Sequence, residues 1–134
     1  IKYMTQEIFK QTKYNQLQKL NAYNNEYITD VNHLENTLIE LNCGHITNSD
    51  WIIYRTDTCA ISQNGIKNLK KLRILDASFN ERINNVNHLA NTLIELNCSY
   101  DCDIDQDGIK DLKVLQKLNA KDNKYINNVN HLAN

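Results

Sequence analysis

The stretch LRILDASFNERINNVNHLANTLIELNC, residues 72–98, decides the fold because the chain contains it more than once. Residues 17–43 read LQKLNAYNNEYITDVNHLENTLIELNC, and residues 115–134 read LQKLNAKDNKYINNVNHLAN. Sequence similarity at a fixed period is typical of solenoids, in which each repeat packs only against its neighbours.

The spacing of the leucines that open each copy defines the period. Leu17 to Leu38 and Leu72 to Leu93 are each 21 residues apart, whereas Leu38 to Leu72 spans 34 residues. The excess separates Cys43 from Cys59, whose counterparts Cys98 and Cys102 are close together. We therefore predict a 12-residue insertion near residues 46–57 of a chain that otherwise alternates two repeat types.

Each repeat begins with L-x-x-L-x-[A/C], usually followed by x-x-[N/D], as in Leu72, Leu75, Ala77 and Asn80. This pattern resembles the leucine-rich repeat, with Ala or Cys at the third leucine position and Ile46 in place of one Asn. The resemblance extends to repeat proteins of large DNA viruses of amoebae and of amoeboid protists. It implies an α/β leucine-rich-repeat solenoid, with parallel β-strands on the concave face and short helices and irregular turns on the convex face.

The physical reading of the residues agrees. Leu75 and Ala77 are two residues apart and so face the same side of a short strand. The recurring Asn can bind backbone groups in the bend that follows the strand. After the bend, one repeat type reads I-x-x-V-x-x-L and predicts tight helical turns. The other reads G-I-K-x-L-K and predicts a short helix, with Gly allowing close packing.

The length and composition predict a single domain that does not bind nucleic acid or a membrane through its overall charge. The chain has 134 residues and a net charge of −1, which gives no bulk attraction to nucleic acid or to a membrane. Residues 1–16 do not match the repeat, and we expect a partial N-terminal cap or flanking helix that Thr5 caps and whose Ile8 and Phe9 cover the first strand. Residues 17–134 form about five repeats, and the interrupted last copy suggests a fragment of a longer array. We expect a monomer.

Three groups of residues suggest a chemical site, and each has a simpler structural explanation. Asp103, Asp105 and Asp107 match the start of a calcium loop, but the sister repeat lacks these carboxylates, so helix capping is favoured. The four cysteines occupy predicted core positions as reduced thiols, which suits a cytoplasmic protein. His33, His88 and His131 share one repeat position, which indicates a structural role. The sequence predicts no catalytic residues, no metal and no cofactor.

The outward strand positions are the better candidates for function. We expect a protein-interaction module, not an enzyme, that binds an unknown protein on the concave face, with aromatic residues as anchors. The alternative is the substrate-recognition part of a ubiquitin-ligase adaptor. The predicted partner-binding residues are Asn21, Tyr23, Asn24, Asn42, His45, Asp76, Ser78, Phe79, Asn97, Tyr100, Asn119, Lys121 and Asp122.

Overall fold

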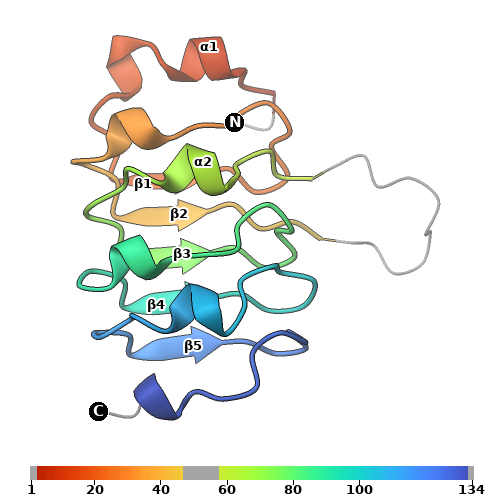
Figure 1. The fold of residues 1–134 in the computed structure, drawn as a ribbon. Helices are drawn as coiled ribbons and strands as arrows, with labels where there is room; N and C mark the ends of the chain where they lie inside the picture. The colour runs from red at the N-terminus through yellow and green to blue at the C-terminus, as the bar shows by residue number, and fades with distance from the viewer. Residues whose placement is uncertain (1–2, 47–57, 133–134) are drawn as a thin grey trace, which may run out of the picture.

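The computed structural model describes residues 3–46 and 58–132, which contain a parallel sheet of five three-residue strands (Figure 1). The strands are β1 (Lys19–Asn21), β2 (Glu40–Asn42), β3 (Ile74–Asp76), β4 (Glu95–Asn97) and β5 (Lys117–Asn119). They lie side by side in chain order, and all four pairings are parallel. This α/β arrangement of regularly stacked strands is compatible with the predicted solenoid.

The middle residue of each strand is a leucine, and the register places these leucines opposite one another. Leu20 pairs with Leu41, Leu41 with Leu75, and Leu75 with Leu96. These four side chains are at most 4% exposed, as predicted. Leu118 continues the row on β5 but is only partly buried, because the described residues place a strand on just one side of β5.

Short helices lie on one side of the sheet, in front of it in Figure 1. From η2 onward they alternate between the two predicted kinds: N-H-L forms the 3₁₀ turns η2, η3 and η5, and the glycine-containing motif forms α2 and η4. The helices are α1 (Gln6–Phe9), η1 (Thr12–Tyr14), η2 (Asn32–Leu34), α2 (Gln63–Ile66), η3 (Asn87–Leu89), η4 (Asp107–Ile109) and η5 (Asn130–Leu132). Buried Leu, Ile, Val and Cys side chains fill the space between the two layers.

A buried asparagine closes the bend after three of the strands. The Nδ2 group of Asn80 donates hydrogen bonds to the carbonyl oxygens of Cys43 (3.0 Å) and Ile61 (3.2 Å), and its Oδ1 accepts one from the Arg82 N–H (2.8 Å). Asn25 and Asn123 are buried in the same way. The predicted role of the recurring Asn is therefore confirmed at Asn25, Asn80 and Asn123, which hydrogen-bond backbone groups of the bend, whereas Asp101 at the matching position is exposed.

Gly65 and Gly108 let the helical layer pack against the backbone of the preceding turn. A Cβ atom at Gly65 would lie 2.1 Å from the carbonyl oxygen of Thr29, and one at Gly108 would lie 2.2 Å from that of Asn84. Both glycine carbonyls also accept a backbone hydrogen bond of 2.9 Å, from Val31 and Val86 respectively. The predicted need for close packing at this position is confirmed.

The N-terminal segment, which we predicted to be a partial cap or a flanking helix, makes some of the same contacts as the repeats. Thr5 does cap α1, and Phe9 is fully buried as expected, but Ile8 is 43% exposed and does not cover the first strand. The side chain of Gln6 binds the backbone of Thr29 and Asp30. Gln63 binds Asn84 and Asn85 in the same way, so α1 occupies a place equivalent to that of α2 one repeat later.

The predicted insertion falls almost entirely outside the described residues. Ile46 is exposed, and residues 47–57 are among those that the structure does not describe. Cys43 and Cys59 are both buried, as are Cys98 and Cys102. The two ends of the insertion thus keep the positions expected from the shorter sister repeat. Within the described ranges, no helix has the length and apolar character needed to span a bilayer.

Candidate functional site

The candidate site is the face of the sheet opposite the helices, where three rows of side chains cross the strand ends. The first row consists of the last residue of every strand. In each case Oδ1 accepts a hydrogen bond of 3.0–3.2 Å from the backbone N–H two residues later. This row is Asn21, Asn42, Asp76, Asn97 and Asn119, and its carbonyl or carboxylate oxygens therefore shape the turn as well as face outward.

The second row follows two residues after the first and is mostly small. Ser78 Oγ lies 2.7 Å from Asp76 Oδ1, and Ser99 Oγ lies 2.7 Å from Asn97 Oδ1, so both hydroxyl groups are engaged within their own turns. Ser99 is 1% exposed. At the β1 end of this row, partial burial and the negative charge of Asp76 raise the pKa of Tyr23. Lys121 occupies the β5 end.

The third row holds two stacked aromatic rings. Phe79 and Tyr100 have ring centroids 4.4 Å apart and planes inclined by 9°. Lys121 Nζ lies 5.9 Å from the centre of the Tyr100 ring, within the range of a cation–π contact. His45 lies on the other side of Phe79, with ring centroids 5.8 Å apart. Three residues of the third row and one of the second form a continuous group, which we call the aromatic row: His45, Phe79 and Tyr100, with Lys121.

The backbone holds these rings in an unusual conformation. Phe79 has a φ of 58° and Tyr100 a φ of 63°, and Asn24 and Asp122 at the matching positions have 53° and 57°. Bulky residues seldom adopt positive φ. The conformation is fixed by backbone hydrogen bonds from Phe79 N to Ser99 O (3.1 Å) and from Tyr100 N to Lys121 O (2.7 Å). Such strain costs on the order of 1–3 kcal/mol and occurs preferentially at functional sites.

The structure therefore brings together some of the predicted partner-binding residues. Phe79, Tyr100 and Lys121 contact one another, and both rings remain partly exposed. His45 is 7% exposed, contrary to the expectation of an outward side chain, because it packs beside Phe79. At the two ends of the third row, Asn24 accepts a hydrogen bond from the Ile46 N–H at 3.4 Å, and Asp122 is exposed.

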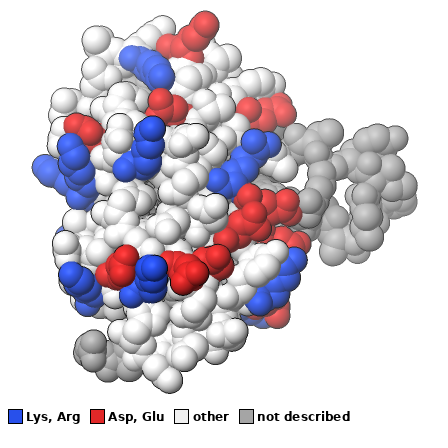
Figure 2. All heavy atoms as spheres, in the orientation of Figure 1, with Lys and Arg blue, Asp and Glu red and all other residues white. Residues whose placement is uncertain are grey.

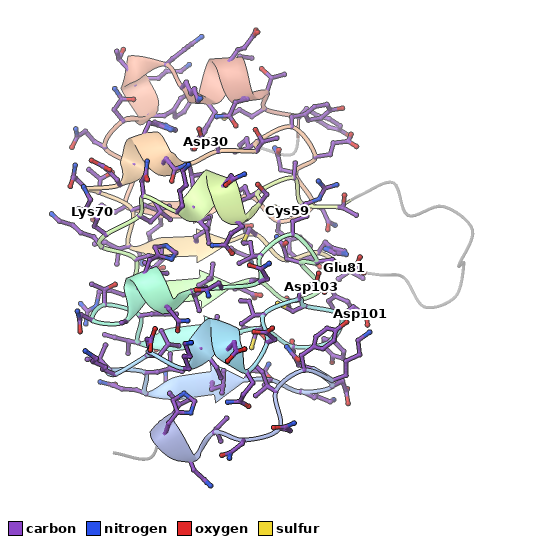
Figure 3. All side chains as sticks on the ribbon, in the orientation of Figure 1. Asp30, Cys59, Lys70, Glu81, Asp101 and Asp103 are labelled. Carbon is purple, nitrogen blue, oxygen red and sulfur yellow. The ribbon has the colours of Figure 1, made fainter. Side chains whose placement is uncertain are left out.

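An acidic cluster lies beyond the ends of the strands, in the segments that follow β3 and β4. Figure 3 labels Glu81, Asp101 and Asp103 close together, and Figure 2 shows Asp and Glu gathered at the same place. Burial and, next, the charge of Glu81 raise the pKa of Asp103. Asp105 Oδ1 accepts a hydrogen bond of 2.7 Å from the Gly108 N–H, which agrees with the predicted capping role. No group of His, Cys, Asp and Glu within residues 3–46 and 58–132 is arranged to hold a metal ion.

The remaining candidate side chains have structural surroundings. Burial raises the pKa of Cys98 and of Cys102 to about 12, and the Cys59 contact and burial raise that of Cys43 well above the usual value, so these thiols stay protonated. Nε2 of His88 lies 3.1 Å from the carbonyl oxygen of Ile66, and Nε2 of His131 lies 3.1 Å from that of Ile109. His88 and His131 thus join neighbouring turns on the helical side, whereas the ring of His33 packs edge-on against Phe9 with centroids 4.9 Å apart and makes no hydrogen bond to a described residue.

Comparison with known proteins gives no match: no family model, no curated protein and no solved structure is significantly similar to this chain.

Proposed function

We propose that this chain is a leucine-rich-repeat solenoid that binds a partner protein on its strand face. The single observation that carries the proposal is the aromatic row, in which Phe79 and Tyr100 stack at 4.4 Å beside the cation of Lys121. Aromatic side chains such as Tyr are enriched among the few residues that contribute most of the free energy of protein–protein association. Asn24 and Asp122 share the positive φ, so the turn itself imposes that conformation, and the stacked, partly exposed rings are what favour a binding role at Phe79 and Tyr100.

The rest of the strand face suits the surroundings of such an anchor. Because the oxygens of the first row cap their own turns, the Nδ2 groups of Asn42 and Asn97 are left as hydrogen-bond donors. Neither amide nitrogen donates a hydrogen bond to a described residue. Asp76 lies between them in the row, so the face alternates donor, acceptor and donor at spacings of about 4.8 Å. A partner backbone or polar side chain matches this pattern.

The fixed rings also reduce the cost of binding. Side chains that must be immobilised on association cost about 0.5–1.5 kcal/mol each, whereas Phe79 and Tyr100 already hold each other in place. A partner residue that covers the stacked pair would therefore gain from desolvating both rings with little further loss of entropy. The expected interface centres on β3 and β4, with Tyr23 and Asn119 toward its margins.

The test compares affinity capture from native cell extract by the wild-type protein and by a Phe79→Ser/Tyr100→Ser variant. The proposal expects specific partners of the wild type to be lost from the variant, with a fall in affinity of tenfold or more on the purified partner, since an anchor contributes about 2 kcal/mol. The matched control, His88→Ser/His131→Ser, alters the helical side and should retain the partner. Retention of the partner by the first variant and loss by the second would contradict the proposal.

A further inference from the structure

A groove of about 500 Å³ lies where strands β2–β5 begin, away from the aromatic row. Four of its lining residues each come directly before the first residue of a strand, so they lie side by side in the same order as the strands. In spatial order these residues are Ile39, Arg73, Ile94 and Gln116. The volume falls in the range of about 300–1,000 Å³ that ligand pockets occupy.

The backbone of this row is rigidly held. The carbonyl oxygen of Ile39 accepts hydrogen bonds from the N–H groups of Arg73 (2.8 Å) and Ile74 (3.1 Å). The carbonyl oxygen of Ile94 accepts two in the same way, from Gln116 (2.8 Å) and Lys117 (3.0 Å). The backbone positions from which the side chains of Ile39, Arg73, Ile94 and Gln116 start are therefore fixed before any ligand arrives.

The lining combines apolar side chains with unpaired positive charge. Ile39, Ile94 and Val114 supply the apolar surface, and Val114 is 40% exposed. Lys71 and Arg73 both line the groove, and neither forms an ion pair with any described residue. Among the residues that the structure describes, no acidic side chain lines the groove. Lys and Arg side chains are prominent in Figure 2 at the left edge, which is where the strands of Figure 1 begin.

The nearest carboxylates on the strands do not neutralise this charge. Glu40 and Glu95 are the first residues of β2 and β4, beside the groove, but each is already engaged by another lysine. Glu40 Oε1 lies 2.7 Å from Lys19 Nζ, and Glu95 Oε1 lies 2.8 Å from Lys117 Nζ. The groove therefore has a local positive charge although the whole chain carries −1.

We propose that this groove binds a short acidic segment of a protein, with a carboxylate between Lys71 and Arg73 and an adjacent apolar side chain against Ile39, Ile94 and Val114. Charge complementarity selects the acid, and the aliphatic lining selects its apolar neighbour. Asn91 and Gln116 add amide groups that a peptide backbone can satisfy, whereas a lipid chain would leave them without partners. The site is separate from the strand face and does not depend on the function proposed for it.

The experiment is a selection from a random peptide library displayed on phage, with the wild-type protein as bait, followed by fluorescence anisotropy on the selected peptide. We expect enrichment of Asp or Glu next to Leu, Ile or Phe, and loss of binding when the acid of that peptide is replaced by its amide. The Lys71→Glu/Arg73→Glu variant should bind the selected peptide about tenfold or more weakly than the wild type, as expected for the loss of charge-assisted hydrogen bonds.

Lys67→Glu is the matched control, because Lys67 is exposed on the helical side and does not line the groove. It should change the affinity less than twofold, and Val114→Asp should weaken binding without disturbing the core. Circular dichroism melting confirms that each variant is folded. The proposal is wrong if the library yields no acidic consensus, if the double variant binds the peptide as the wild type does, or if dodecanoate competes and peptide does not.

Discussion

Replacing Asn80 by Ala tests whether the buried asparagines hold the repeats together. Asn80 is 1% exposed, and its amide nitrogen bridges the carbonyl oxygens of Cys43 and Ile61, which come from two different segments of the preceding repeat. The substitution leaves both carbonyl oxygens without this donor, and each unsatisfied buried group costs about 1–3 kcal/mol of folding free energy. The third partner, the Arg82 N–H, belongs to an exposed residue and can bind water instead. We expect the free energy of unfolding to decrease by about 2–5 kcal/mol, which is a large part of the 5–15 kcal/mol that is typical of a folded protein.

Equilibrium unfolding in urea, followed by circular dichroism, measures this loss. Asn21→Ala is the control, because Asn21 is exposed and caps only the Tyr23 N–H, so its removal should cost about 0.5–1.5 kcal/mol. Asn80→Asp adds a second check. Its carboxylate would face two carbonyl oxygens, so its pKa should rise in the folded state and its destabilisation should shrink as the pH falls toward about 4. Equal losses for Asn80→Ala and Asn21→Ala would refute the reasoning.

Three further predictions concern the core, the packing and the pH dependence. Leu75→Ala should destabilise the protein by about 2–5 kcal/mol and Leu118→Ala by clearly less, because Leu118 is already partly exposed; urea unfolding compares them. Gly108→Ala should cost about 1–3 kcal/mol or more, since its Cβ would lie 2.2 Å from the Asn84 oxygen, and a melting temperature equal to the wild type would contradict the close packing. Burial lowers the pKa of His33 and His88, so as the pH falls the unfolded chain takes up protons before the folded chain does. The free energy of unfolding should therefore be highest above about pH 6.5 and decrease below it. The His33→Gln/His88→Gln variant should show a smaller decrease when urea unfolding is measured at several pH values.

The strand register followed from the sequence because it depends on one simple repeat. A leucine at a fixed place in every copy, with a small apolar residue two positions later, can satisfy only one face of a strand. The stacked leucine row of β1 to β4 is therefore fully buried. Leu118 departs from the row because burial also requires a neighbour on the far side, a tertiary condition that the motif itself does not contain.

The N-terminal element could be recognised only from its contacts. Met4, Thr5 and Gln6 align with Ile61, Ser62 and Gln63, but the similarity is too short and the following segment is longer. The structure identifies the relationship through hydrogen bonds, since the Nδ2 group of Asn25 binds the Met4 carbonyl oxygen as Asn80 binds that of Ile61.

The strand face was predictable in position but not in detail. The spacing placed Phe79 and Tyr100 in one row, whereas their positive φ could not be foreseen, because bulky residues rarely adopt it. The burial of His45 was missed for a related reason: its place in the motif is outward, but the Phe79 ring packs beside it. The groove before the strands was also missed, since Ile39 and Arg73 are not motif residues and become neighbours only when the strands pair.

Site-specific photo-crosslinking at position 100 tests the proposed interface most directly. A photoreactive phenylalanine analogue in place of Tyr100 keeps the stacked ring and reports what lies over it in the native cell extract. We expect a discrete crosslinked partner from position 100 that excess unlabelled wild-type protein suppresses, and none from the same analogue at Asn64 on the exposed helical side. A partner crosslinked at Asn64 but not at position 100 would contradict it.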